Sequence, residues 1–405
     1  MRRSRLDNWI CSLEGLSEVT PENLESLQLE RLNSLLLRER ERGGFYSALP
    51  CRLESLSELA SLPFTTAEQL AENVSSMLLC SQAEVSRVIS GSTSGTTGPA
   101  KRVFYTRRDI EHTVGFFAAG IGEFVLSGDT VMIAMPFSGP FGLGDLIAEA
   151  VTSLGAAALR TGADRSLGEL CSELDSVQPE AYIGMPVPLL GLLRYYVNLN
   201  GRLPPLRRAL ISGDACPEGV VSEIEALLSS RLFPHYGSRE MCLGGAVTCP
   251  AHDGMHLRAN HIIAEIVDAA GSPLPAGEWG ELVITTLNME ALPLIRYRTG
   301  DYTRLLPAPC PCGSCTPRLD RVSRLNRRER LMEQLDSTLF LLPSLLDYAA
   351  ELLPGRLKIS ALTLDGRDPG LAASAKRLFP DTEIEAVCRK ADENTVLSAR
   401  KRTFL

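Results

Sequence analysis

The segment from residue 90 to residue 101 combines glycines with hydroxyl side chains and ends on a lysine. It reads Ser-Gly-Ser-Thr-Ser-Gly-Thr-Thr-Gly-Pro-Ala-Lys. Glycine lets backbone N–H groups converge without side-chain clash, and Ser and Thr add further hydrogen-bond donors. With the positive charge of Lys101 close by, such donors are suited to binding a polyphosphate. The alternative is a flexible surface hairpin that is merely rich in Ser and Gly.

The spacing of this segment differs from two widespread phosphate-binding motifs. It contains neither the G-x-x-x-x-G-K-[ST] of the P-loop nor the G-x-G-x-x-G of dinucleotide-binding folds. Apolar residues stand on both sides of it, with Val85, Val88 and Ile89 before and Val103, Phe104 and Tyr105 after. We therefore expect a strand, a glycine-rich loop and a second strand.

A second kind of chemistry is indicated by cysteine and histidine pairs at short spacing. Cys249-Pro-Ala-His-Asp-Gly-Met-His256 precedes Cys310-Pro-Cys-Gly-Ser-Cys315 by about fifty residues. Two such pairs are a recurrent pattern of structural zinc sites. We expect tetrahedral Zn²⁺ bound by Cys249, His256, Cys310 and Cys312, with His252 and Cys315 in reserve. Free thiols in a loop are the alternative.

The elements that position these residues follow from the pattern of apolar runs. Residues 20–42 read as a helix that Gly43-Gly44 ends, because leucines repeat at helical spacing after Thr20 and Pro21. Between residues 85 and 300, short β-branched runs alternate with helical stretches, which predicts a sheet covered by helices. Runs 262–267 and 280–285 predict antiparallel strands, and residues 330–405 a small α/β tail with strands 357–364 and 382–387 around helix 370–379.

Length and composition limit the class of protein. A chain of 405 residues is too long for one ordinary core, so we expect two or more domains. The net charge of −8 argues against nucleic-acid binding, and no apolar run approaches the roughly 20 residues of a membrane span. The basic N-terminus lacks the apolar core of a signal peptide. We therefore expect a cytoplasmic protein whose 11 cysteines are mostly reduced thiols.

Three downstream motifs give the glycine-rich loop a context. They are His235-Tyr-Gly-Ser-Arg-Glu240, Tyr297-Arg-Thr-Gly-Asp301, and Arg324 beyond the Cys-rich segment. In this order, together with Ser94-Gly-Thr-Thr-Gly98, they resemble the adenylate-forming superfamily of acyl-CoA ligases, luciferases and peptide-synthetase adenylation domains. The resemblance is strongest to phenylacetate–CoA ligases, through Tyr105-Thr-Arg-Arg-Asp109 and through residues 281–301, and it covers residues 24–324.

The resemblance implies a site for Mg·ATP. Ser94, Gly95, Thr96, Thr97 and Gly98 would bind the β- and γ-phosphates, and Lys101 would help to neutralise them. Many relatives have a second Lys where this chain has Pro99-Ala100. Glu240 would bind Mg²⁺, a cation that prefers carboxylate and phosphate oxygens, although it could instead be an acid at a helix N-terminus. The nucleoside would contact a further set of residues: Gly213, Asp214, Ala215, Tyr236, Gly237 and Asp301.

Asp301 would accept hydrogen bonds from both ribose hydroxyls, its alternative being a turn residue after Gly300. Arg324 would help to hold the ribose or phosphate where two domains meet. The implied fold is α/β, with a large N-terminal domain of layered sheets and a β-rich subdomain (residues 1–323) and a small α/β lid (residues 324–405). In relatives a late Lys on the lid screens the reacting anions. Lys401 is the candidate here, with a solvated lysine in a basic tail as the alternative.

The implied reaction joins a carboxylate to ATP, giving acyl-adenylate and pyrophosphate, and then transfers the acyl group to coenzyme A. Phe137, Phe141 and Met185 would suit an aromatic or small apolar acid, although each could be ordinary core packing. The resemblance also implies a homodimer. Where relatives have two acids at the hinge, this chain has Leu325-Asn-Arg-Arg328, which would fit impaired thioester formation. Two alternatives follow: an adenylyltransferase acting on a cofactor or carrier, and a nucleotide-binding protein with a degenerate lid.

Overall fold

The structure is a computed structural model that describes residues 4–91, 101–307 and 309–405. These residues form two compact units, each built from two stretches of chain. Unit 1 comprises residues 1–123 and 235–322, and unit 2 comprises residues 124–234 and 323–405. The sequence predicts a different division of the chain, into domains of residues 1–323 and 324–405. That domain boundary stays a prediction.

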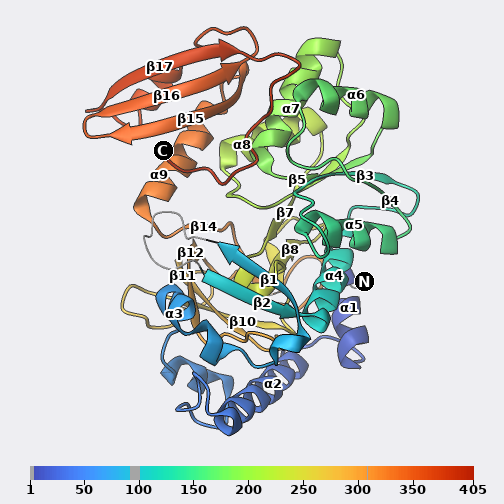
Figure 1. The fold of residues 1–405 in the computed structure, drawn as a ribbon, viewed down its shortest axis with the longest axis vertical. Coiled ribbons are helices and arrows are strands. Elements are labelled where there is room, and N and C mark those ends of the chain that lie inside the picture. Colours follow the sequence, from blue (N-terminus) through green and yellow to red (C-terminus); the bar gives the residue numbers. More distant parts are fainter. Residues whose placement is uncertain (1–3, 92–100, 308) are drawn as a thin grey trace. The chain divides into compact units, whose positions relative to one another are not determined.

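Unit 1 holds four α-helices and antiparallel pairs of strands in its described residues (Figure 1). The helices are α1 (Arg5–Glu14), α2 (Pro21–Arg42), α3 (Ala67–Met77) and α4 (Arg107–Ile121). The strands are β1 (Val85–Gly91), β2 (Lys101–Thr106), β8 (Ala246–Thr248), β9 (Met255–Leu257), β10 (Ile262–Val267), β11 (Gly280–Thr286), β12 (Tyr297–Thr303) and β13 (Arg318–Leu319). Antiparallel pairing joins β1 to β2, β8 to β9, β9 to β13, and β10 to β11 to β12.

The ends of these helices follow from their terminal residues. In α2, the Thr20 side chain caps the N-terminus, Pro21 occupies the first turn, and Gly43 ends the helix with φ +69°. In α4, Thr106 and Asp109 form a reciprocal capping box. This capping places the start of α4 directly after β2, at whose first position Lys101 lies.

Unit 2 contains the alternating βαβ region that the sequence predicts. Strands β3 (Thr130–Ala134), β4 (Ala157–Leu159), β5 (Ala181–Gly184) and β6 (Arg208–Ile211) are parallel in the order β4-β3-β5-β6. The first half of β7 (Phe233–Tyr236) pairs parallel to β6. The helices of this region are α5 (Leu143–Ser153), α6 (Leu167–Val177), α7 (Pro186–Asn200) and α8 (Glu218–Leu228).

The second stretch of unit 2 adds a three-stranded sheet. After β14 (Ser323–Arg324) and α9 (Arg327–Leu339), β15 (Leu345–Leu353) pairs antiparallel to β16 (Arg356–Thr363), which pairs parallel to β17 (Glu383–Lys390) after α10 (Leu371–Lys376). One hydrophobic core joins the two stretches, because Leu193 and Tyr196 of α7 share it with Leu346, Leu397 and Phe404. The C-terminal residues are therefore packed into unit 2.

The overall α/β class, with several sheets, agrees with the prediction from the sequence. In the part of the chain that the structure describes, no helix combines the length and apolarity needed to cross a membrane.

Two histidines are buried side by side in unit 1. His112 of α4 and His261 lie with Nδ1 and Nε2 3.1 Å apart, and Trp9 of α1 stacks on the His261 ring. Burial, with Arg258 nearby, lowers the pKa of His112 to about 4 and that of His261 well below its usual value. Both imidazoles are therefore neutral in the folded protein at neutral pH.

This pair predicts a loss of stability in acid. Unfolded histidine binds a proton near pH 6.5, whereas folded His112 does so only near pH 4, so stability is complete above 6.5 and falls as the pH decreases. We expect His112→Asn to reduce the slope of unfolding free energy against pH between 6.5 and 4 by up to ~1.4 kcal/mol per pH unit. Urea unfolding at several pH values measures this slope, and equal slopes in variant and wild type would contradict the prediction.

Candidate active site

A lysine, a glutamate and a tyrosine meet in unit 1. Lys101 Nζ donates to Glu240 Oε1 at 2.5 Å and to the Tyr297 hydroxyl at 3.0 Å. The Tyr297 hydroxyl in turn donates to Glu240 Oε1 at 3.3 Å. Lys101 begins β2, Tyr297 begins β12, and Glu240 lies in the 3₁₀ turn Arg239–Met241. Three separate segments thus bring one cation and one carboxylate together.

The electrostatics of Glu240 depend on this contact. Glu240 is only 8% exposed. Burial raises the pKa of its carboxyl, but the charge and hydrogen bond of Lys101, with hydrogen bonds from the turn, bring the pKa below its ordinary value. Glu240 is therefore a buried, ionised carboxylate with the Lys101 ammonium as its counter-ion. A carboxylate of this kind fits a hard divalent cation that would replace the lysine.

A bulge in β12 directs Asp301 toward Tyr236. Val283 pairs with Arg298 and Glu281 with Tyr302, so three residues of β12 face one residue of β11. Gly300 permits this with φ +73°. The Tyr236 hydroxyl donates to Asp301 Oδ2 at 2.6 Å. The predicted nucleoside residues of unit 1 are thus adjacent, and Asp301 has carboxylate oxygens of the kind that a ribose diol requires.

Gly237 separates Tyr236 from the turn that holds Glu240. A Cβ at this position would lie 2.0 Å from the carbonyl oxygen of Leu243. Only glycine allows this close approach of two backbone segments. Its role in the described structure is to bring the turn close to β7, whereas a direct contact with nucleotide stays a prediction.

The four predicted zinc ligands gather in unit 1. The ligand atoms of Cys249, His256, Cys310 and Cys312 all lie within 4.8 Å of one another. Cys249 Sγ is 3.8 Å from Cys310 Sγ, and Cys312 Sγ is 3.4 Å from His256 Nε2. Two thiolates at ~2.3 Å from one tetrahedral Zn²⁺ would be about 3.8 Å apart. The arrangement therefore has the ligand types and spacing of a zinc site. The reserve residues His252 and Cys315 are outside this group of four.

A hydrogen-bond chain fixes the orientation of His256. Its Nδ1 lies 2.7 Å from Thr316 Oγ1, which is 2.8 Å from Ser314 Oγ. Ser314 Oγ donates to Asp7 Oδ1 of α1 at 2.7 Å. Pairing of Nδ1 with a hydroxyl leaves Nε2 for the cysteine side, which is the arrangement that histidine ligands of metals adopt.

Other predicted site residues belong to unit 2. Gly213 has φ +89°, a backbone conformation that favours glycine. A Cβ added at Gly213 would lie 3.4 Å from Met185 Cγ, so the two residues are neighbours. The next residue, Asp214, accepts hydrogen bonds from the backbone N–H of Ala215 at 2.9 Å and of Arg402 at 2.8 Å. Burial raises the pKa of the Asp214 carboxyl, against the opposing influence of Arg402. The charge of Lys401, the residue before Arg402, is a smaller opposing influence. The structure thus brings the C-terminal residues to the predicted nucleotide segment.

The predicted acyl residues and Arg324 are also in unit 2. Met185 is buried at the N-terminus of α7, Phe137 packs beneath the Arg160 guanidinium at 4.2 Å, and Phe141 adopts φ +65°. These contacts identify no acyl pocket. The Arg324 backbone N–H donates to Glu333 Oε1 at 3.1 Å, at the start of the C-terminal stretch. The residues predicted to bind phosphate, Ser94 to Gly98, lie outside the described residues.

Two residues that contact the predicted site residues were missed by reasoning from the sequence. Tyr297 contacts both Lys101 and Glu240, and its place four residues before Asp301 in one motif was a usable signal. Arg402 is the other, a buried arginine beside the Lys401 candidate. It looked like one member of a basic tail, because nothing in the sequence indicates its distant partners.

Comparison with known proteins places these observations in a family. The AMP-binding enzyme family model matches residues 92–290. Phenylacetate-coenzyme A ligase of Aromatoleum evansii is 31% identical over 73% of this chain and 69% of its own length. The enzyme of that name from Pseudomonas putida is 31% identical over 78% of this chain and 73% of its own. A homologue of that name from Thermus thermophilus is 26% identical and covers 92% of this chain and 88% of its own.

Solved structures agree on the fold. A 2-hydroxyisobutyryl-CoA ligase in the postadenylation state superposes with a TM-score of 0.77 at 19% identity, over 96% of this chain and 90% of that one. The same ligase in the thioesterification state has a TM-score of 0.67 at 20% identity, over 95% and 91%. The α/β architecture is thereby confirmed. With relatives of this identity and coverage, the chain belongs to the phenylacetate–CoA ligase family of AMP-binding, adenylate-forming enzymes.

Proposed function

We propose that this protein is an ATP-dependent carboxylate–CoA ligase acting on an aromatic or small apolar acid. In the first step a carboxylate oxygen of the acid attacks the α-phosphorus of ATP, and the bond to pyrophosphate breaks. In the second step the coenzyme A sulfur attacks the acyl carbon, its proton is lost, and AMP leaves. The observation that carries the proposal is the buried contact of Lys101 with Glu240 beside Tyr297. Family membership supports the same chemistry.

The residues of unit 1 would bind and orient the nucleotide. Mg²⁺ would supply charge neutralisation at the phosphates, and Glu240 would hold it. Lys101 would move from Glu240 to a phosphate oxygen, since its ammonium group is on a flexible stem. Asp301 would accept hydrogen bonds from the ribose hydroxyls, with Tyr236 steadying one of its oxygens. Because the attacking acid and the triphosphate are both anions, this positioning and screening are the main catalytic contribution of the chain.

Further roles are proposed for residues of unit 2. Gly213, Asp214 and Ala215 would contact the adenine, and Phe137, Phe141 and Met185 the acyl group. Arg324 and Lys401 belong to the segment proposed as the lid, residues 324–405, with Lys401 screening the reacting anions. A homodimer stays a prediction of the family resemblance.

Zinc is proposed as a structural component. Cys249, His256, Cys310 and Cys312 would hold it in unit 1, and it would take no part in the reaction. Its geometric support is the 3.8 Å separation of two cysteine sulfurs and the fixed orientation of His256.

The test is pyrophosphate release from Mg·ATP with a panel of aryl and short-chain acids, with and without coenzyme A. We expect release that depends on one class of acid, together with thioester formation when coenzyme A is present. Acid-dependent release without thioester would reject the ligase and favour another acceptor. The absence of release with every acid, in protein that binds ATP, would contradict the proposed function.

A further inference from the structure

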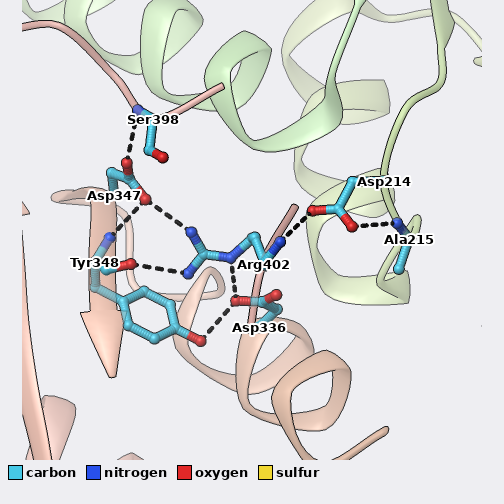
Figure 2. Close-up of polar contacts among 7 residues, drawn as sticks. All are labelled: Asp214, Ala215, Asp336, Asp347, Tyr348, Ser398 and Arg402. Atoms are coloured by element: carbon cyan, nitrogen blue, oxygen red, sulfur yellow. Dashed lines mark hydrogen bonds and ion pairs between the residues drawn. The ribbon is translucent and has the colours of Figure 1, made fainter. Parts of the chain in front are cut away.

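The C-terminal segment of unit 2, residues 398–405, contains a buried arginine with two acidic partners (Figure 2). Arg402 Nε donates to Asp336 Oδ1 of α9 at 2.8 Å, and Nη1 donates to Asp347 Oδ1 of β15 at 2.9 Å. Its Nη2 donates to the carbonyl oxygen of Tyr348 at 3.1 Å. The Arg402 side chain is 10% exposed, and those of Asp336 and Asp347 are 3% and 7% exposed. One guanidinium therefore joins the C-terminal segment to both a helix and a strand.

The backbone of the same arginine reaches a different part of the unit. As Figure 2 shows, its N–H points to Asp214, donating to Oδ2 at 2.8 Å, while Asp214 Oδ1 accepts from Ala215. Asp214 lies after β6, nearly two hundred residues before Arg402 in the chain. The Arg402 side chain and backbone thus connect the predicted nucleotide segment, residues 213–215, to α9 and β15.

Further contacts hold the segment on both sides of Arg402. The Ser398 N–H donates to Asp347 Oδ2 at 3.1 Å, and the Leu405 N–H donates to the carbonyl oxygen of Ala350 at 2.9 Å. Phe404 is buried and packs edge-to-face against Phe379. Lys401 lies inside this held segment, and its own side chain is exposed. A lysine on a restrained backbone has fewer positions to search than one on a free tail.

The charges of this cluster are interdependent. Burial raises the pKa of Asp336 to about 6, against the opposing influence of Arg402. Burial alone would lower the pKa of Arg402, but Asp336, Tyr348 and Asp347 raise it above its usual value. Removal of the guanidinium would leave two buried carboxyl groups without their cation, which is strongly destabilising in such clusters.

We propose that Arg402 is a positioning residue that holds Lys401 and the Asp214 segment together for acyl-adenylate formation. The role of Lys401 in acyl-adenylate formation rests on the proposed function. That Arg402 restrains the C-terminal segment does not rest on it, since this follows from the contacts of Arg402 alone. Arg402 would act by fixing the backbone on which Lys401 stands, and not by touching substrate.

A merely structural arginine offers a matched control. Arg194 of α7 is also buried in unit 2, where its guanidinium donates to the carbonyl oxygens of Phe340, Leu342 and Leu345 and to Glu223. It makes none of the described contacts to residues 213–215 or 398–405. Arg194→Met should therefore cost stability without disturbing the segment.

The experiment compares Arg402→Met, Arg402→Lys and Arg194→Met in the full chain, below their unfolding temperatures. For Arg402→Met we expect kcat for pyrophosphate release to fall roughly 100-fold, the size of effect that a misplaced catalytic group produces. We expect KM for ATP to rise by a smaller factor than kcat falls. Loosening of residues 213–215 would weaken ATP binding, whereas misplacement of Lys401, a group needed only in the transition state, lowers kcat. Arg402→Lys should recover part of the loss, since lysine can pair with one acid but lacks the planar fork.

Hydrogen exchange provides a readout independent of activity. Exchange in residues 213–215 and 398–405 should increase in Arg402→Met and not in Arg194→Met. An unchanged kcat in Arg402→Met, an equal loss of kcat in Arg194→Met, or unchanged exchange would each overturn the proposal. If the wild-type protein releases no pyrophosphate with any acid, the proposed function fails, and the exchange data alone then decide whether Arg402 restrains the segment.

Discussion

Glu240→Gln is expected to lower acid-dependent pyrophosphate release by at least ~100-fold, a typical effect of removing one preorganised electrostatic group from an active site. The substitution keeps the shape of the side chain and removes its charge. Glu240 is buried and contacts Lys101 at 2.5 Å, so its carboxylate is the anion available to bind Mg²⁺ beside the lysine. A neutral amide binds Mg²⁺ weakly, and we expect the apparent affinity for Mg²⁺ to fall with the rate. A Mg²⁺ titration of pyrophosphate release measures both.

The same substitution leaves Lys101 without its counter-ion, so stability has to be measured as well. Breaking a buried ion pair costs about 3–5 kcal/mol, and part of any loss of activity could come from unfolding. Lys101→Met serves as the second variant: it leaves the Glu240 carboxylate unpaired, and we expect it to weaken ATP binding while Mg²⁺ dependence persists. Glu111→Gln, in an exposed pair with Arg107, is the control for charge. Glu240→Gln protein that is folded and releases pyrophosphate at the wild-type rate would refute the assignment.

Local sequence signals predicted most elements that position the site. The α2 helix begins and ends where Thr20, Pro21 and Gly43 indicate, because capping and proline effects depend on neighbouring residues only. The βαβ alternation in unit 2 was likewise predicted from the sequence, since buried parallel strands appear there as short apolar runs. The strand β15 was not predicted. Its sequence, Leu-Leu-Asp-Tyr-Ala-Ala-Glu-Leu-Leu, is rich in helix formers, and pairing with β16 overrides their propensity.

The candidate site was predictable to the extent that its chemistry is confined to short motifs. Glu240 and Asp301 are each in a motif, and the structure places each beside a tyrosine, Tyr297 or Tyr236. The clustering of the four candidate zinc ligands was likewise predicted, because cysteine and histidine pairs have few other uses at that spacing. The Arg402 cluster could not be predicted. It depends on contacts with residues 54 to 188 positions away, and no local pattern encodes which arginine of a basic tail is buried.

Removal of the proposed zinc is expected to have the largest effect on stability. A structural zinc site contributes on the order of 10 kcal/mol of binding free energy in small domains, and part of it appears as folding free energy. We expect zinc analysis to find one ion per chain. Cys310→Ser should lower the unfolding temperature of the protein by roughly 10 °C or more, given the usual relation between free energy and melting temperature. Calorimetry with and without a chelator measures the same contribution in the wild-type protein.

The location of the ligands explains why this loss should exceed that of an ordinary cysteine. Cys249 follows β8 and His256 lies in β9, whereas Cys310 and Cys312 belong to the segment before β13. One ion would therefore close a loop of about sixty residues and fix the segment that Ser314 links to α1 through Asp7. Cys51→Ser, at an exposed free thiol, is the control and should leave the unfolding temperature unchanged. Protein without zinc that melts at the same temperature as untreated protein would show that the four ligands hold no structural metal. The proximity of their sulfur and nitrogen atoms would then be ordinary packing of three cysteines around His256.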